Sequence, residues 1–266
     1  MAEKLPWDKL LEQALTAPGS LTGVYDRFHD YSITNMMLFL MQGMFEPVAS
    51  ESRWKSLGRT KRIDARRKQV IVPLFAIESD PEPAPDGETL EEKRVRVSRL
   101  IGFTVVKGVL GLSDTEGPEL PPREIPGWSA EQMLEKLAIR RVPFESTNGN
   151  LQGYSRGVEI AINPLAVHPE KTLAHEVGHV ILGHTLPHSF EDYQAHRGIK
   201  EFQAEGVAYL VMNELDMLDE ETAAHCRGYI RHWLKDETPP DTAIRQVFTA
   251  ADRILRSGRV AIAAAE

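Results

Sequence analysis

The chain has 266 residues, of which 42% are hydrophobic and 26% are charged, and its formal net charge is −8. These values are typical of soluble globular proteins and exclude a disordered or fibrous chain. The longest apolar run, Met36 to Met41, is far shorter than the roughly 20 residues that cross a bilayer, and the single cysteine excludes an internal disulfide. The N-terminal residues lack the apolar core of a secretion signal. We therefore expect a cytoplasmic protein with no membrane partner.

The first half of the chain combines helix-like and strand-like patterns. Apolar residues at three- and four-residue spacing predict helices, and runs of β-branched and apolar residues predict strands. Two helices and then two strands are expected, at residues 10–15, 21–44, 69–77 and 99–106. The segment 80–87, rich in Pro and acid, predicts the loop at the tip of a hairpin. A Pro-rich stretch at 113–127 is expected to be an interdomain linker.

The second half is predicted to be mostly helical with a small sheet. Expected helices lie at 129–140, 169–184, 200–215, 220–234 and 242–257, and expected strands at 142–144 and 158–162. The predicted fold class is therefore α+β, with one domain over residues 1–115 and another over residues 128–266.

The segment His175-Glu-Val-Gly-His179 has the spacing of a metal site on a helix. Residues four apart lie one above the other, so the two imidazoles can bind one ion. Glu176 lies beside them, where it can act as general base on a water that the ion activates. This H-E-x-x-H pattern predicts a zinc-dependent hydrolase with Glu176 as its catalytic residue.

A catalytic zinc usually has three protein ligands and keeps one position for water. The next expected helix contains Glu201 and Glu205 on a common face. The E-x-x-A-E spelling is similar to that of gluzincin peptidases, which favours Glu201 as the third ligand and Glu205 as the residue that orients a ligand histidine. The opposite assignment stays open. For His184 we expect a position at the surface or behind the ligands.

A basic stretch precedes the first expected strand. Between Glu51 and Val70 there are eight basic and two acidic residues, although the whole chain is acidic. A protein that binds single-stranded DNA uses cations along the phosphates and aromatic rings on which the bases stack. The candidate DNA-binding residues are Arg53, Trp54, Lys55, Arg59, Lys61, Arg62, Arg66, Arg67 and Lys68. The alternative is a solvated basic face beside a buried tryptophan.

Several segments together resemble the ArdC family of antirestriction proteins. They include Phe28-His-Asp-Tyr-Ser-Ile-Thr-Asn35, Trp54-Lys-Ser-Leu-Gly-Arg59, the H-E-x-x-H segment and Gln203-Ala-Glu-Gly-Val-Ala-Tyr209. The resemblance implies a domain that binds single-stranded DNA, joined to a zincin domain like that of ImmA/IrrE metallopeptidases. Relatives have a glycine turn after the Leu-Gly-Arg, whereas this chain has Thr60-Lys-Arg-Ile-Asp64.

Two functions follow from these patterns. The first is a Zn²⁺-dependent metallopeptidase whose N-terminal domain binds single-stranded DNA, with an antirestriction or regulatory role and a protein or peptide substrate. The second is a non-catalytic DNA-binding or protein-interaction protein with a structural zinc site. The presence of Glu176 favours the first, because a structural site needs no general base.

Overall fold

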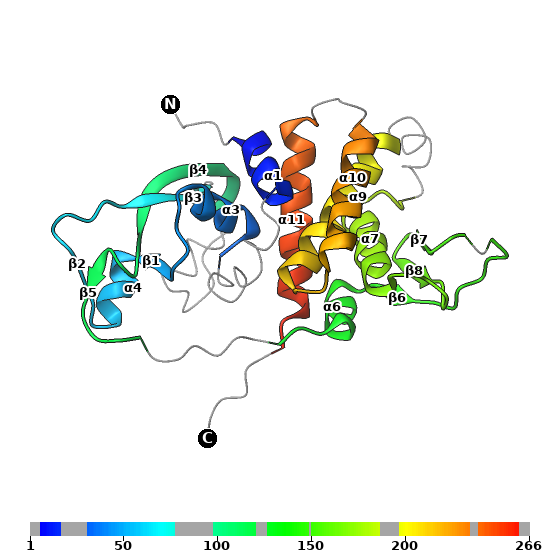
Figure 1. The fold of residues 1–266 in the computed structure, drawn as a ribbon, viewed down its shortest axis with the longest axis horizontal. Helices are drawn as coiled ribbons and strands as arrows, with labels where there is room; N and C mark the ends of the chain where they lie inside the picture. The colour runs from blue at the N-terminus through cyan, green and yellow to red at the C-terminus, as the bar shows by residue number, and fades with distance from the viewer. Residues whose placement is uncertain are drawn as a thin grey trace, which may run out of the picture. The chain divides into compact units, whose positions relative to one another are not determined.

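The computed structural model describes residues 6–16, 31–77, 98–120, 127–148, 150–186, 197–234 and 239–260. Contacts between residues divide the chain into two compact units. The first unit is Met1–Pro6 with Gln42–Pro118, and the second is Trp7–Met41 with Glu119–Glu266. Helices and strands occur in both units (Figure 1), which confirms the α+β fold class. No helix within the described residues is both long and apolar enough to cross a membrane.

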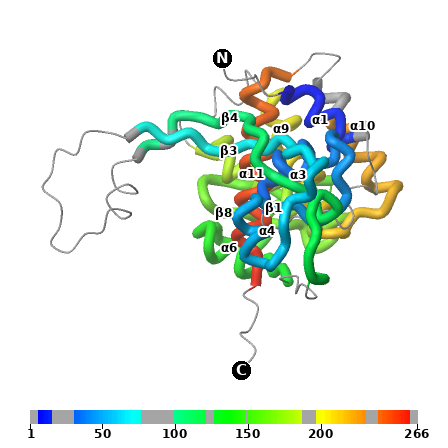
Figure 2. Tube along the Cα trace, turned by 90° about the vertical axis from the view of Figure 1, so that its left-hand side faces the viewer, coloured from blue at the N-terminus to red at the C-terminus, as the bar shows by residue number. Residues whose placement is uncertain are grey.

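The first unit is built around a three-stranded antiparallel sheet. Its order is β1 (Val48–Ser50), β4 (Ser98–Gly111) and β3 (Lys68–Ile77), and β3 and β4 run side by side over their length (Figure 2). A second small sheet pairs β2 (Thr60–Lys61) with β5 (Thr115–Glu116). Helix α4 (Glu51–Ser56) begins at the N-cap Ser50, whose hydroxyl accepts a hydrogen bond from the Arg53 backbone.

The second unit packs helices around one central helix. Helix α9 (Arg197–Glu214) is buried over most of its length and packs against α7 (Pro169–Ile181), α10 (Glu220–Leu234) and α11 (Asp241–Gly258). Most of its buried residues are apolar, but the buried set also includes Lys200, Gln203, Glu205, Asn213 and Glu214. The other helices are α1 (Trp7–Thr16), α3 (Ile33–Met41) and α6 (Ala130–Leu137). A sheet of order β6 (Arg140–Arg141), β8 (Glu159–Ile162) and β7 (Gly153–Arg156) lies against α7.

Helices α7 and α9 are in contact at Gly178. A Cβ atom built on Gly178 would lie 3.4 Å from the side chain of Val207 and 3.5 Å from the Ala204 backbone, so Gly178 faces α9 directly. Since Gly178 lies within the H-E-x-x-H segment, this contact brings both histidines of that segment close to the acidic residues of α9.

Most of the expected elements are confirmed, with some differences. The helices after residue 160 and the two long strands lie within a few residues of their expected positions. The strand expected at 142–144 lies instead at 140–141, because Ala138 ends α6 in a left-handed conformation (φ 55°) and the chain pairs with β8 at once. Helix α1 and helix α3 group with the second unit, although both were expected in the domain 1–115. Residues 21–30 and 80–87 lie outside the described residues.

Candidate metal centre

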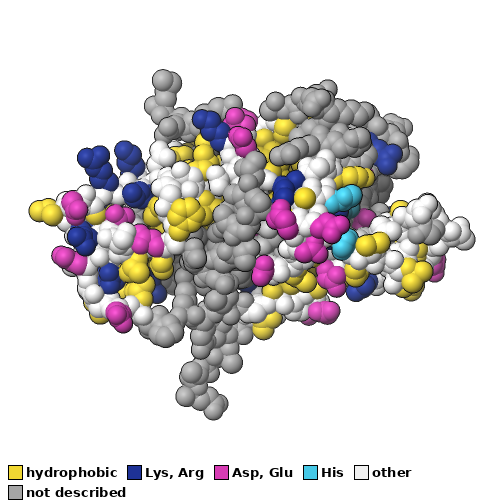
Figure 3. All heavy atoms as spheres, in the orientation of Figure 1, with side chains coloured by type: hydrophobic (Ala, Val, Ile, Leu, Met, Phe, Trp, Pro, Cys, Tyr) yellow, Lys and Arg dark blue, Asp and Glu magenta, His cyan; other side chains and the backbone are white. Residues whose placement is uncertain are grey.

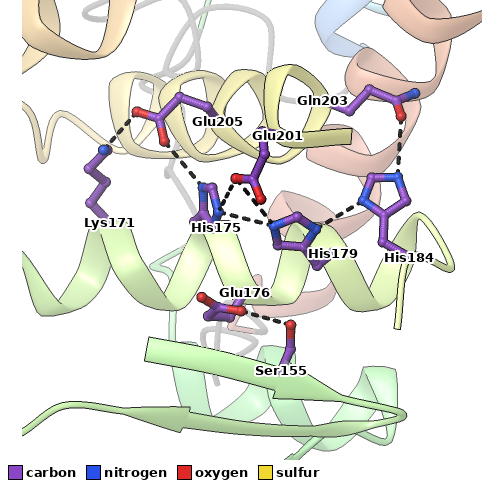
Figure 4. A network of polar contacts seen from close by, with 9 residues as sticks. All are labelled: Ser155, Lys171, His175, Glu176, His179, His184, Glu201, Gln203 and Glu205. Atoms are coloured by element: carbon purple, nitrogen blue, oxygen red, sulfur yellow. Dashed lines mark hydrogen bonds and ion pairs between the residues drawn. The ribbon is translucent and has the colours of Figure 1, made fainter. Parts of the chain in front are cut away.

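Two histidines and one glutamate converge where α7 faces α9 (Figure 4). The Nε2 atoms of His175 and His179 are 3.1 Å apart. The Oε2 atom of Glu201 lies 3.5 Å from the first and 3.9 Å from the second. A point equidistant from these three atoms would be about 2 Å from each, which is the usual length of a bond from nitrogen or oxygen to zinc. The donor set and its spacing therefore fit a divalent cation.

The other nitrogen of His175 contacts a buried ion pair. Its Nδ1 lies 3.2 Å from Oε2 of Glu205, and Oε1 of Glu205 is 2.7 Å from the ammonium nitrogen of Lys171. Burial opposes a charge on His175, but the hydrogen bonds to Glu201 and Glu205 outweigh it and raise the pKa of His175 to about 9. Burial likewise opposes ionisation of Glu205, yet the bond from His175 and the Lys171 charge lower the pKa of that carboxyl below its usual value.

The other ring nitrogen of His179 contacts uncharged groups. Its Nδ1 is 3.0 Å from Nδ1 of His184, and Nε2 of His184 is 3.2 Å from the amide oxygen of Gln203. Burial and the positive charge of His175 lower the pKa of His179 to about 3. Burial lowers the pKa of His184 to about 4. His179 is therefore neutral at pH 7, which is the form that binds a metal.

Glu176 points from α7 toward the small sheet and lies beside the candidate metal ligands. Its side chain is buried, and its Oε2 accepts a hydrogen bond of 2.7 Å from the hydroxyl of Ser155 on β7 (Figure 4). Burial raises the pKa of Glu176 above its usual value, although the His175 charge and the Ser155 bond oppose the rise. A raised pKa makes the carboxylate a stronger base, as general catalysis near neutral pH requires.

Strand β7 lies unusually close to α7. A Cβ atom on Gly153 would be 2.7 Å from Cγ2 of Thr172 and 3.0 Å from the carbonyl oxygen of Ala161, so glycine is the residue that fits there. The close packing holds Ser155 within reach of Glu176.

A cavity of about 1010 Å³ opens over the cluster. Its walls come from β7, α7, the start of α9 and α10, and they include Tyr154, Arg156, Arg197, His225 and Tyr229 beside the residues named above. The rings of His225 and Tyr229 lie stacked with their centroids 6.4 Å apart. A large open cavity beside three ligand atoms has room for a substrate.

The structure thus brings together all the residues that the sequence suggested for the metal site. Glu201 faces the Nε2 atoms of both histidines, and Glu205 contacts the outer nitrogen of His175. Sequence analysis did not single out Ser155, Lys171 or Gln203. Lys171 had a detectable signal, because it precedes His175 by four residues on the same helix face. Ser155 and Gln203 had none, because their contacts depend on the packing of different elements.

The candidate DNA-binding residues divide into buried and exposed groups. Trp54 is 1% exposed and its indole N–H donates to the carbonyl oxygen of Leu110. Arg59 is 8% exposed and donates to the side chain and carbonyl of Thr115, at 2.9 Å and 3.0 Å, and to the carbonyl of Gly117 at 3.1 Å. These two residues belong to the core of the first unit. This agrees with the alternative of a buried tryptophan beside a basic face, and it corrects the expectation that Trp54 offers a ring face to bases and Arg59 a cation to phosphate.

The remaining basic residues are accessible. Exposed side chains are Arg53, Lys55, Arg62, Arg66 and Arg67, and half-buried ones are Lys61 and Lys68. In the space-filling view, dark-blue Lys and Arg side chains gather over the first unit, whereas cyan His and magenta acidic side chains meet on the surface of the second (Figure 3). Glu51 forms ion pairs with Lys55 and Arg67, at 3.1 Å and 2.5 Å. The positive charge of the stretch is therefore partly balanced on α4.

Comparison with known proteins bears on the second unit. Residues 135–231 match the family model of the IrrE N-terminal-like domain. This match covers the H-E-x-x-H segment and both candidate acids, and it confirms the ImmA/IrrE-like part of the resemblance that the sequence motifs indicate. No curated protein matches the chain.

The chain is also similar to two crystal structures of the antirestriction ArdC protein from the R388 plasmid. The metal-free structure has a TM-score of 0.45 at 15% identity, and the match covers 95% of this chain and 94% of that one. The Mn(II)-bound structure has a TM-score of 0.46 at 15% identity, with 96% and 98% covered.

Proposed function

We propose that the second unit is a metal-dependent peptidase, with His175, His179 and Glu201 as ligands and Glu176 as general base. The observation that supports this most directly is the convergence of three donor atoms beside a buried carboxylate and an open cavity. A structural zinc site is normally closed by four protein ligands, whereas the group that could hold a metal in the described part of the chain has three side chains.

The proposed mechanism assigns a task to each residue. A bound divalent cation supplies Lewis acidity, which lowers the pKa of a water molecule and polarises the carbonyl of the scissile bond. Glu176 takes a proton from the attacking water and later delivers it to the leaving amine. Ser155 holds the carboxylate of Glu176 by donating its hydroxyl, and Glu205 orients the ring of His175. His225 and Tyr229 lie on the cavity wall, where they can donate to the oxygen that gains negative charge.

The test separates metal binding from catalysis. Purified wild type is analysed for metal after dialysis and incubated with a peptide library derived from a digested proteome, with cleavage read by mass spectrometry. We expect near-stoichiometric metal, zinc among the candidates because this donor set also accepts other divalent ions. Glu201→Ala should lose the metal, and Glu176→Gln should keep the metal and lose cleavage.

Glu170→Gln provides the matched control, since Glu170 is an exposed residue in the first turn of the same helix. Metal bound by wild type with cleavage unchanged in Glu176→Gln would contradict the catalytic role. Bound metal without any cleavage by wild type would support the non-catalytic alternative, in which the site stabilises a DNA-binding or interaction protein.

We further propose that the first unit binds single-stranded DNA through its exposed cations and through phenylalanines on the β3–β4 ribbon. Phe75 is 56% exposed and Phe103 is 48% exposed, and such rings provide the stacking surface that buried Trp54 does not. Base stacking on a ring contributes roughly 1–3 kcal/mol per base. Cations that contact phosphates make single-strand binding weaken with salt, by about 0.7 in the log–log slope per contact.

Fluorescence anisotropy with a labelled oligothymidine, over a range of salt concentrations, tests this proposal. We expect Arg66→Glu to weaken binding and flatten the salt slope, and Phe103→Ala to weaken binding with the slope unchanged. Glu116→Gln, on β5 of the same unit, is the control. An affinity that is unaffected by both changes would contradict the proposed surface. An antirestriction role is tested by transferring unmodified DNA into a restricting host with and without the protein.

A further inference from the structure

A second chain of hydrogen bonds leads away from the metal site, on the side opposite Glu205. It begins at His179, passes through His184 on the turn after α7, and reaches Gln203 on α9 (Figure 4). All three side chains are buried, with exposed fractions of 6%, 8% and 4%. Buried polar groups nearly always form hydrogen bonds, so each donor in this chain should face an acceptor. This requirement gives the direction of each bond.

The direction is fixed at Gln203. Its amide nitrogen lies 2.7 Å from Oε1 of Gln246 and 3.5 Å from the backbone carbonyl of Ala243 on α11. A backbone carbonyl only accepts, so the amide nitrogen faces it and the amide oxygen faces His184. The oxygen of Gln203 also only accepts. Nε2 of His184 must therefore carry the hydrogen in this bond.

The same reasoning continues to His179. A neutral imidazole has one N–H and one bare nitrogen, so His184 with its hydrogen on Nε2 has a bare Nδ1. That atom accepts the Nδ1–H of His179, and the Nε2 of His179 is left bare. The contact with His175 supports the same tautomer of His179, because Nε2 of His175 lies 3.1 Å from Nε2 of His179 and can donate a hydrogen bond to it.

We infer that His184 and Gln203 are positioning residues that hold the hydrogen of His179 on Nδ1, so that its Nε2 lone pair faces the metal site. This inference rests on the proposed function, because it assigns the support of one proposed ligand. It also completes an asymmetric pair of supports: His175 is held by the charged pair Glu205–Lys171, and His179 is held by the uncharged pair His184–Gln203.

Metal affinity measures the contribution of this support. Partners behind a metal ligand usually change affinity about 10- to 100-fold. We expect His184→Leu to weaken Zn²⁺ binding to that degree, measured by competition with a fluorescent chelator. His184→Asn should recover most of the loss, because its amide oxygen takes the place of Nδ1. His168→Leu is the matched control, since His168 is exposed at the start of α7.

A double-mutant cycle shows whether the two residues act as one chain. Once His184→Leu has broken the chain, Gln203→Leu should cause little further loss of affinity, so the two effects will not add. Glu205→Gln acts on the other histidine, and its effect should add to that of His184→Leu. Additive losses within the His184–Gln203 pair would overturn the inference.

The tautomer of His179 is observed directly in the metal-free protein by long-range ¹H–¹⁵N NMR of labelled histidines. We expect hydrogen on Nδ1 in wild type and in His184→Asn, and hydrogen on Nε2 in wild type would overturn the inference even if His184→Leu does not fold. Normal Zn²⁺ affinity in a folded His184→Leu would also overturn it and leave the proposed metal site intact. A wild type that shows the expected tautomer and binds neither Zn²⁺ nor another divalent cation would instead overturn the proposed function.

Discussion

The raised pKa of His175 predicts a strong pH dependence of metal binding. The pKa is about 9, and at pH 7 a group with that pKa is neutral in about one molecule in a hundred. Since only the neutral ring binds a metal, binding at pH 7 must displace a proton. The apparent affinity should rise about tenfold per pH unit between pH 7 and pH 9 and then level off. His179, with a pKa of about 3, is neutral throughout this range and adds no competition.

The raised pKa of His175 also determines how the stability of the metal-free protein changes with pH. The folded-state pKa of His175 lies above its value of 6.5 in an unfolded chain, so the charged ring stabilises the metal-free fold. This contribution is fully present below pH 6.5 and is lost as the pH rises through about 9. The metal-loaded protein should show the opposite trend, because its metal is held more tightly at high pH.

Titrations with a competing chelator between pH 6 and pH 10 provide the assay, and calorimetry in buffers of different ionisation enthalpy counts the protons released. Glu205→Gln should lower the pKa of His175, so the metal affinity of this variant should level off at a lower pH than that of wild type. An affinity that stays constant between pH 7 and pH 9 would refute the assignment of a charged His175 in the metal-free protein.

Three further changes have expected results. Gly153→Val should destabilise the protein by about 1–3 kcal/mol and weaken cleavage, because the new side chain would displace β7 and Ser155 from α7. Thermal unfolding measures the change in stability, and Gly228→Ala, which has open space around it, is the control. Trp54→Ala should cost about 3–5 kcal/mol in urea unfolding, since it leaves a cavity and removes the hydrogen bond that the Leu110 carbonyl accepts from the indole. Lys171→Met should cost at most about 3–5 kcal/mol, because it removes one of the two cationic partners of the buried Glu205 and leaves His175 as the other, and adding Glu205→Gln should recover part of the loss in Tm.

The parts of the fold that the sequence could predict are those set by local periodicity. Helices α7, α9, α10 and α11 have apolar residues at helical spacing over long segments, and all were expected close to their observed positions. Strand β7 and helix α4 were not predicted, because four or six residues contain too little of either period. The grouping of α1 and α3 with the second unit depends on contacts between distant segments, such as α1 with α11, which no local pattern records.

In the candidate site, too, the sequence predicted the features that are local and missed those that depend on packing. His175, Glu176 and His179 were found because a single helix fixes their relative positions, and Glu201 and Glu205 because one helical face contains both acids. The positions of Trp54 and Arg59 were misjudged because an aromatic ring and a cation within a basic stretch look alike in sequence whether they are buried or exposed. Burial is a property of the packed unit, and it changes the role of both residues.

The different supports of the two histidines have a consequence for the chemistry of the site. Each carboxylate near the cation supplies negative charge that reduces its power to polarise a carbonyl, while also strengthening its binding. Glu201 and Glu205 already lie within reach of the ligand cluster, and Lys171 offsets the charge of Glu205. If His179 were also held by a carboxylate, the surroundings of the cation would gain a further negative charge. The uncharged pair His184–Gln203 would orient His179 without that addition, so the proposed site would hold a metal firmly and keep the Lewis acidity that the proposed hydrolysis needs.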